Sequence, residues 1–144
     1  MIQTRECTKN DFHHIKRLLF QLWPDLYDDE NYLKNIFEKR IDKKSHFLIC
    51  AEEDDSIIGF CSLVVKNTFL VNGLYGQIDE VVVDDTLRNK GIGKILLDEV
   101  IKIAMKAGCR MIELNTAFHR VNAHKFYEKY GFKKVAFVFS MDIE

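Results

Sequence analysis

The stretch Val81-Val82-Val83-Asp84-Asp85-Thr86-Leu87-Arg88-Asn89-Lys90-Gly91-Ile92-Gly93-Lys94 decides the fold of this chain. A run of valines, typical of a buried strand, leads through a short polar loop into a segment with hydrophobic residues at helical spacing. We expect this helix to span Gly91–Lys106, because Gly108 follows where a helix commonly ends. The sequence therefore predicts a strand, a short loop and a long helix in direct succession.

The loop has the composition of a phosphate-binding turn. Gly91 and Gly93 remove side chains where the backbone must approach a ligand closely. A helix N-terminus also offers unpaired N–H groups and the positive end of the helix dipole. The cations beside it are Arg88, Lys90 and Lys94. A phosphate group is therefore the expected ligand.

Two commoner phosphate motifs are excluded by single positions. A P-loop requires glycine where Arg88 stands and a hydroxyl residue where Ile95 stands. A dinucleotide-binding fingerprint requires glycine where Leu96 stands. The alternative is an ordinary junction between strand and helix, in which the glycines serve packing alone.

The rest of the chain alternates between strand and helix patterns. The other expected elements are a strand at Ile2–Cys7, a helix that starts at Thr8 and stops at Trp23-Pro24, a helix at Glu30–Ile41, strands at His46–Ala51, Ile57–Lys66, Gly76–Val83 and Arg110–Asn115, a helix at Asn122–Tyr130, and one or two strands at Phe132–Ile143. This order predicts a mixed α/β sandwich around one sheet. The length of 144 residues fits a single domain, residues 1–144.

Composition excludes several classes of protein. The net charge of −1 gives no overall field toward nucleic acid or an anionic membrane, and no apolar run approaches the length of a membrane span. The four cysteines form no CxxC pair, so we expect buried free thiols and a cytoplasmic location. No metal site is expected, because His119 and His124 lack the spacing and the companion ligands of a zinc site.

Two motifs resemble those of a known family. Arg88-x-x-Gly91-x-Gly93, after a valine-rich strand, resembles the acetyl-CoA motif of the GNAT superfamily of N-acetyltransferases. Asn122-Ala123-His124-Lys125-Phe126-Tyr127-Glu128-Lys129-Tyr130-Gly131-Phe132 resembles the second signature of that superfamily. The resemblance implies an α/β (α+β) fold with a mixed, mostly antiparallel sheet flanked by helices. The sheet would be splayed between Gly76–Val83 and Arg110–Asn115, with the pantetheine arm in the splay.

The same resemblance implies the residues that bind acetyl-CoA. They are Val81, Val82, Val83, Arg88, Asn89, Lys90, Gly91, Ile92, Gly93, Lys94, Asn115, Asn122 and Tyr127. The backbone N–H of Val81 would contact the thioester carbonyl, and Val83 would pair with the pantetheine amides. Asn122 heads a helix, so it would act as an N-cap, contact the pantetheine arm, or do both.

The family reaction is direct attack of a free amine on the acetyl thioester. Tyr127 matches the tyrosine that family members place near the coenzyme sulfur, and a phenol with a pKa of about 10 can protonate a leaving thiolate. The alternative for Tyr127 is an aromatic residue that packs into the core. The residue is expected to be the general acid.

Two carboxylates, Asp79 and Glu80, stand in an otherwise apolar strand. Buried carboxylates are costly without a partner or a purpose. Strict alternation places Gln77, Asp79 and Val81 on one face and Glu80 on the other. Since the resemblance puts the base at Gln77 or Asp79, Asp79 is the first candidate. Glu80 is the second, because a bulge would switch faces. Either residue could instead pair with a lysine.

The acceptor is expected to be a small-molecule amine. The loop Leu22–Glu30 mixes aromatic residues with four carboxylates, which suits a polycation with flat apolar faces. Residues Phe12–Glu30 also resemble the start of aminoglycoside 6′-N-acetyltransferases. A solvated acidic helix start is the alternative, and polyamines, amino sugars and protein lysines remain open as acceptors.

One alternative belongs to another class of protein, a non-catalytic sensor that binds acyl-CoA. Arg88–Gly93 and Tyr127 are intact, which argues against it. A homodimer is the assembly considered, with no nucleic acid and no membrane as partner. The sequence thus predicts an acetyl-CoA-dependent acyltransferase that acts on a primary amine.

Overall fold

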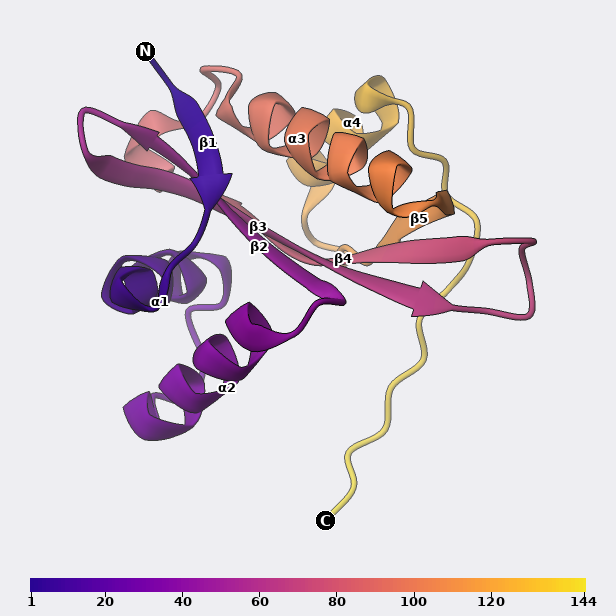
Figure 1. The fold of residues 1–144 in the computed structure, drawn as a ribbon, viewed down its shortest axis with the longest axis horizontal. Helices are drawn as coiled ribbons and strands as arrows, with labels where there is room; N and C mark the ends of the chain where they lie inside the picture. Colours follow the sequence, from indigo (N-terminus) through magenta and orange to yellow (C-terminus); the bar gives the residue numbers. More distant parts are fainter. The chain divides into compact units, whose positions relative to one another are not determined.

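The computed structural model describes residues 1–144, which form two units, Met1–Glu113 and Leu114–Glu144. The first unit holds a five-stranded sheet in the order β1-β2-β3-β4-β5 (Figure 1). Its strands are β1 (Gln3–Glu6), β2 (His46–Glu53), β3 (Ser56–Asn67), β4 (Leu74–Val83) and β5 (Cys109–Leu114). Neighbours from β1 to β4 pair antiparallel, so the expected mixed, mostly antiparallel fold is confirmed.

Three helices cover the two faces of this sheet (Figure 1). Helices α1 (Phe12–Leu22) and α2 (Glu30–Asp42) lie on one face, and α3 (Ile92–Ala107) lies on the other. Two 3-10 turns, Lys9–Asp11 and Asp85–Leu87, precede α1 and α3. The helix boundaries agree with the periodicity of the sequence to within a few residues.

The core under α1 and α2 explains why these helices form. Their apolar stripes pack on the facing side chains of β2, β3 and β4. The buried members of this cluster are Cys7, Phe12, Ile15, Leu18, Phe37, Leu48, Cys50, Ile57, Phe60 and Val82. Burial of such side chains contributes roughly 1.5 to 3 kcal/mol each, so this face anchors both helices to the sheet.

The opposite face needs a glycine for α3 to approach. A Cβ at Gly59 would lie 2.9 Å from Leu96 Cδ1 and 3.2 Å from Ile92 Cγ2. Glycine at this position of β3 therefore lets the first turns of α3 rest directly on the sheet. The start of α3 is held there beside the end of β4.

The hairpin between β2 and β3 turns at two adjacent acidic residues. Asp54 and Asp55 have φ values of 52° and 64°, and Glu53 pairs with Ser56. Two residues with positive φ give a turn whose twist matches that of the strands it joins. The polar residues between the two strands therefore form a tight hairpin turn.

The second unit contains α4 (Val121–Tyr130), which ends at Gly131 with φ of 130°. The strands expected at Phe132–Ile143 are absent, and this prediction was wrong. Apolar residues do alternate there, but Phe137, Phe139 and Met141 are exposed. An extended segment becomes a strand only when its backbone pairs with a neighbour, and this segment has no paired strand.

No helix combines the length and the hydropathy that crossing a membrane requires. All four cysteines are free thiols; Cys7, Cys50 and Cys61 are buried and Cys109 is half-buried. Burial raises the pKa of Cys61 and of Cys109 above the ordinary thiol value. These two thiols are therefore held in the neutral form.

Candidate active site

The loop between β4 and α3 is fixed by side chains of α1. Arg17 Nη1 lies 2.9 Å from Asp84 Oδ2, and Gln21 Oε1 accepts from the backbone N–H of Asp85 at 2.8 Å. Asp84 also accepts from the backbone N–H of Thr86 at 3.1 Å. Burial acts to raise the pKa of Asp84, but the bonds from Thr86 and Arg17 outweigh it and lower that pKa. Asp84 is thus a charged anchor for the loop.

The loop backbone takes the left-handed conformation at two positions. Asn89 has φ of 65° and Gly91 has φ of 80°, and Gly91 is the N-cap of α3. Such alternation of backbone conformation turns successive N–H groups toward one concavity, which suits an anion. A Cβ at Gly91 would meet no atom within 4 Å. The glycine is therefore required by its backbone conformation and leaves open space above the helix N-terminus.

The first turn of α3 has no side-chain cap. The first backbone hydrogen bond of the helix runs from the Ile95 N–H to the C=O of the N-cap residue Gly91, at 3.1 Å. The N–H groups of the preceding residues in that turn lack intrahelical acceptors, as in any helix. Arg88 and Lys90 are exposed beside them, whereas Lys94 is paired with Asp98 at 2.9 Å. The loop can hold a phosphate with backbone donors and two nearby cations.

Strand β4 contains a bulge at Asp79. Ser62 pairs with Glu80 and Leu63 pairs with Ile78, so Asp79 has no partner on β3. Directly paired residues share a face, and Val64, two residues beyond Ser62, pairs with Gln77. Gln77 and Glu80 therefore lie on the same face. The strict alternation expected from the sequence was wrong, because the extra residue of a bulge reverses the faces beyond it.

The bulge separates the two candidate bases. Asp79 is exposed, whereas Glu80 is 9% exposed and faces α1 and α2. Glu80 Oε1 accepts from Ser62 Oγ at 2.6 Å and from Arg40 Nη1 at 3.0 Å. Ser62 Oγ in turn accepts from the Glu80 N–H at 3.1 Å. These contacts hold Glu80 rigidly and leave Oε2 as an acceptor.

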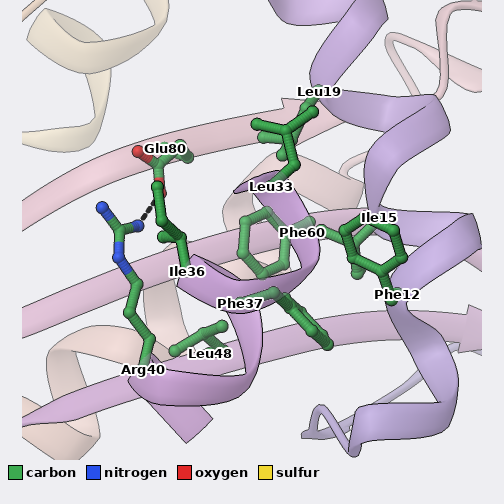
Figure 2. A pocket seen from close by; sticks show the side chains of 10 residues that line it. All are labelled: Phe12, Ile15, Leu19, Leu33, Ile36, Phe37, Arg40, Leu48, Phe60 and Glu80. Atoms are coloured by element: carbon green, nitrogen blue, oxygen red, sulfur yellow. Dashed lines mark hydrogen bonds and ion pairs between the residues drawn. The ribbon is translucent and has the colours of Figure 1, made fainter. Parts of the chain in front are cut away.

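A cavity of about 50 Å³ opens beside Glu80, between α1, α2 and the sheet (Figure 2). Its lining is Phe12, Ile15, Leu19, Leu33, Ile36, Phe37, Arg40, Leu48, Phe60 and Glu80. Figure 2 shows the ion pair of Arg40 and Glu80 at one end and the aromatic rings at the other. A cavity with an apolar wall and a few polar groups is typical of a small-molecule site.

The acidic loop before α2 is engaged with protein groups. Lys16 Nζ lies 3.0 Å from Asp28 and 3.4 Å from Glu30. Asp29 is the N-cap of α2 and accepts from the Tyr32 N–H at 3.1 Å. Of the four carboxylates, three therefore cap the helix or pair with α1. Much of the negative charge expected to attract a polycation is already offset.

The second unit carries three of the predicted residues. Asn115 is exposed after β5, and Asn122 is the second residue of α4, whose N-cap is Arg120. Asn122 is therefore no N-cap, since the helix begins one residue earlier than expected. The ring of Tyr127 packs against Phe126 at 5.4 Å and Phe132 at 5.9 Å between centroids. These contacts orient the half-buried Tyr127 within its own unit.

One group of potential metal ligands was not anticipated. Ligand atoms of Cys7, Asp11 and Cys50 lie within 4.8 Å of one another. Both carboxylate oxygens of Asp11 are already used, by Arg5 at 2.8 and 3.1 Å and by the Thr8 N–H at 2.7 Å. Asp11 therefore serves the start of α1 and offers little to an ion.

Sequence reasoning missed the groups that support the site. Arg17 and Gln21 hold the loop, and Arg40 and Ser62 hold Glu80. A signal existed for Arg40, which follows Ile36 and Phe37 at helical spacing and so places a charge on an apolar stripe. The other three look like ordinary surface or strand residues.

Known proteins share this architecture. The model of the acetyltransferase (GNAT) family matches residues 11–132. The uncharacterized N-acetyltransferase YhdJ of Bacillus subtilis is 30% identical over 141 residues, 96% of this chain and 97% of that protein. The aminoalkylphosphonate N-acetyltransferase of Salmonella typhimurium is 27% identical over 138 residues, 96% of this chain and 89% of that protein.

Solved structures agree on the fold. The aminoglycoside N-acetyltransferase AAC(6′)-Iy, solved in complex with CoA, superposes with a TM-score of 0.87 at 21% identity, covering 99% of this chain and 95% of that chain. The family match and the N-acetyltransferase relatives place the chain among acyltransferases of the N-acetyltransferase class. The chain belongs to the acetyltransferase (GNAT) family, as the sequence motifs indicated.

Proposed function

We propose that this enzyme transfers the acetyl group of acetyl-CoA to a primary amine of a small molecule. The observation that carries this proposal is the left-handed backbone at Asn89 and Gly91 before the start of α3, which has no side-chain cap and where a Cβ at Gly91 would meet no atom within 4 Å. A pyrophosphate fits such a concavity. The CoA complex of AAC(6′)-Iy gives the cofactor that a relative of this fold accepts.

The residues expected to bind the coenzyme keep their assigned roles in this proposal. Arg88–Lys94 would hold the pyrophosphate, and the backbone of Val81–Val83 would pair with the pantetheine arm and the thioester carbonyl. Asn115, Asn122 and Tyr127 keep the coenzyme-binding roles that the family resemblance implies.

We assign the chemistry as follows. The amine nitrogen forms a bond to the acetyl carbon, and the carbon–sulfur bond breaks after a tetrahedral intermediate. Glu80 takes the proton that the amine loses, since it is buried and held beside the cavity. Asp79 is the alternative base and would act through water. Tyr127 donates a proton to the departing thiolate.

The size of the cavity indicates the size of the acceptor amine. Its size admits a small group, so a compact amine fits it better than several sugar rings. A relative acts on aminoalkylphosphonates, which are compact amines of this kind. An aminoglycoside is the second candidate, supported by the likeness of Phe12–Glu30 to aminoglycoside 6′-N-acetyltransferases.

Release of CoA thiol from acetyl-CoA in the presence of a panel of amines tests the proposal. The panel should contain aminoalkylphosphonates, amino sugars, polyamines, aminoglycosides and a lysine peptide. Turnover with at least one member is expected. Binding of acetyl-CoA without turnover across the panel would instead support a sensor. A cytoplasmic location is part of the proposal, because free thiols and an acetyl-CoA substrate fit a reducing compartment. A homodimer is the assembly that we propose.

A further inference from the structure

The cavity beside Glu80 contains two charged groups of opposite sign in an otherwise apolar lining (Figure 2). Arg40 belongs to the last turn of α2, and its side chain is 32% exposed. Its guanidinium uses Nη1 for Glu80 and makes no other hydrogen bond within the protein. Most of the N–H donors of the forked guanidinium group are therefore available to a ligand beside the cavity.

Two more basic side chains lie on the same face of the sheet. His46 pairs with Val64, and Lys66 stands two residues further along β3, so both share the face that Ser62 and Glu80 occupy. Lys66 Nζ is positioned by Gln77 Oε1 at 2.6 Å. The face that carries the carboxylate of Glu80 thus also carries basic groups further along the sheet.

The pKa of His46 reflects the positive charges around it. Burial lowers the pKa of His46 first, and the positive charges of Arg40, Lys43 and Lys66 lower it further. Asp79 acts in the opposite direction. The positive charges of Arg40, Lys43 and Lys66 therefore all act at His46 and keep its pKa below the ordinary histidine value.

This arrangement suits a zwitterion. An ammonium group can bind Glu80 through Oε2, and an anion can bind the open side of Arg40. Each charge of the ligand then meets its opposite, and the ion pair of the protein need not break. A doubly charged tetrahedral group matches several cations and the forked donors of arginine better than a singly charged group does.

We propose that Arg40, with His46 and Lys66, forms an anion subsite that selects amines bearing a phosphate or phosphonate group. This inference rests on the proposed function, because the subsite serves the acceptor of the same reaction. It names the substrate class: a compact primary amine whose second group is a phosphomonoester or a phosphonate.

Matched acceptors test the inference. The value of kcat/KM should be measured for 2-aminoethylphosphonate against propylamine and for glucosamine 6-phosphate against glucosamine. We expect the anionic member of at least one pair to be favoured by about 10- to 100-fold, the range of a charge-assisted contact. In Arg40→Gln this ratio should collapse toward one. Arg40→Lys, which keeps the charge but loses the fork, should give an intermediate ratio.

Lys39→Gln is the control, because it removes one charge from the adjacent, exposed position of α2 and should leave the ratio unchanged. If Arg40→Gln fails to fold, Lys66→Gln replaces it and should lower the ratio by a smaller factor. Equal kcat/KM within both pairs, in an enzyme that does acetylate amines, would overturn the anion subsite and leave the proposed function intact.

Equilibrium binding separates the two proposals. Calorimetry with 2-aminoethylphosphonate and without acetyl-CoA needs no turnover. Binding that is lost in Arg40→Gln and kept in Lys39→Gln would support the subsite even if no amine were acetylated. Absence of binding to the wild-type enzyme, together with no preference in the kinetics, would refute it.

Discussion

Glu80 accepts hydrogen bonds from Ser62 and Arg40 through one oxygen, Oε1, at 2.6 and 3.0 Å. The bulge at Asp79 makes this possible, because it places Glu80 opposite Ser62 and on the α2 face. A carboxylate that is held through one oxygen can still accept a proton on the other. The same geometry therefore positions a base and defines the end of the cavity.

Replacement of the two carboxylates should distinguish the base. We expect Glu80→Gln to slow turnover by about 100- to 10,000-fold near neutral pH, and to recover in part at higher pH as more free amine appears. Asp79→Asn should change the rate by less than about 10-fold. Rates measured across pH on both variants decide this. A larger loss in Asp79→Asn, with the same recovery at high pH, would assign the base to Asp79.

The two glycines that flank α3 provide a matched test of the coenzyme loop. Gly91 and Gly108 have φ of 80° and 96°, and a Cβ at either would meet no atom within 4 Å. Valine at either position should destabilise the protein by a similar amount, because both backbones are left-handed. Only Gly91→Val should lose the stabilisation that acetyl-CoA gives the wild type, which thermal denaturation measures. An equal thermal shift in both variants would place the coenzyme elsewhere.

The order of elements was predictable because each carries a local signal. The capping of the 3-10 turn before α1 by Thr8 and Asp11, the Asp54-Asp55 turn and the C-terminal Gly108 are all properties of a few neighbouring residues. The bulge at Asp79 could be raised from the sequence only as an alternative to strict alternation, since it depends on the register between β3 and β4. Register is a property of two strands and leaves no mark in one of them.

The C-terminal segment shows a second limit of prediction from the local sequence, because a strand predicted there does not form. Its alternation of apolar residues, from Val135 to Ile143, is a strong strand signal. The side chains are exposed, and the backbone has no ladder. A period of two describes which face a residue would take, whereas pairing depends on a partner that the local sequence does not contain.

The role of Tyr127 can be tested by removal of one oxygen. Tyr127→Phe keeps the ring that packs on Phe126 and Phe132, so the fold of α4 should be unaffected. If the phenol protonates the thiolate, kcat should fall by about 10- to 1000-fold while the affinity for acetyl-CoA is maintained. Steady-state kinetics and calorimetry give the two quantities. An unchanged kcat would reduce Tyr127 to a packing residue.

The acidic loop tests the aminoglycoside alternative. Asp28 is paired with Lys16, so its charge is already offset. We expect Asp28→Asn to change KM for an aminoglycoside by less than about twofold, as is usual for exposed pairs. Turnover at saturation should also be maintained. A KM that rises tenfold or more would show that the loop binds a polycation and would favour the aminoglycoside.

The pair of Arg5 and Asp11 predicts how stability depends on pH. The bonds from Arg5 lower the pKa of Asp11 below its ordinary value, against the opposing effect of burial, and the Thr8 N–H lowers it further. A carboxyl whose pKa is lower in the folded state stabilises that state above the pKa of the unfolded chain, about 4. This contribution is lost as the pH falls below 4 and through the folded pKa. Asp11→Asn should therefore lower the urea midpoint at pH 7 and should make progressively less difference as the pH falls below 4 through the folded pKa of the wild-type carboxyl. Glu38→Gln, which removes a carboxyl of α2 that forms no ion pair, should change the midpoint little at either pH. If Asp11→Asn destabilised the protein equally at pH 7 and at pH 2, the effect would come from the shape of the cap and not from the charge of the carboxylate.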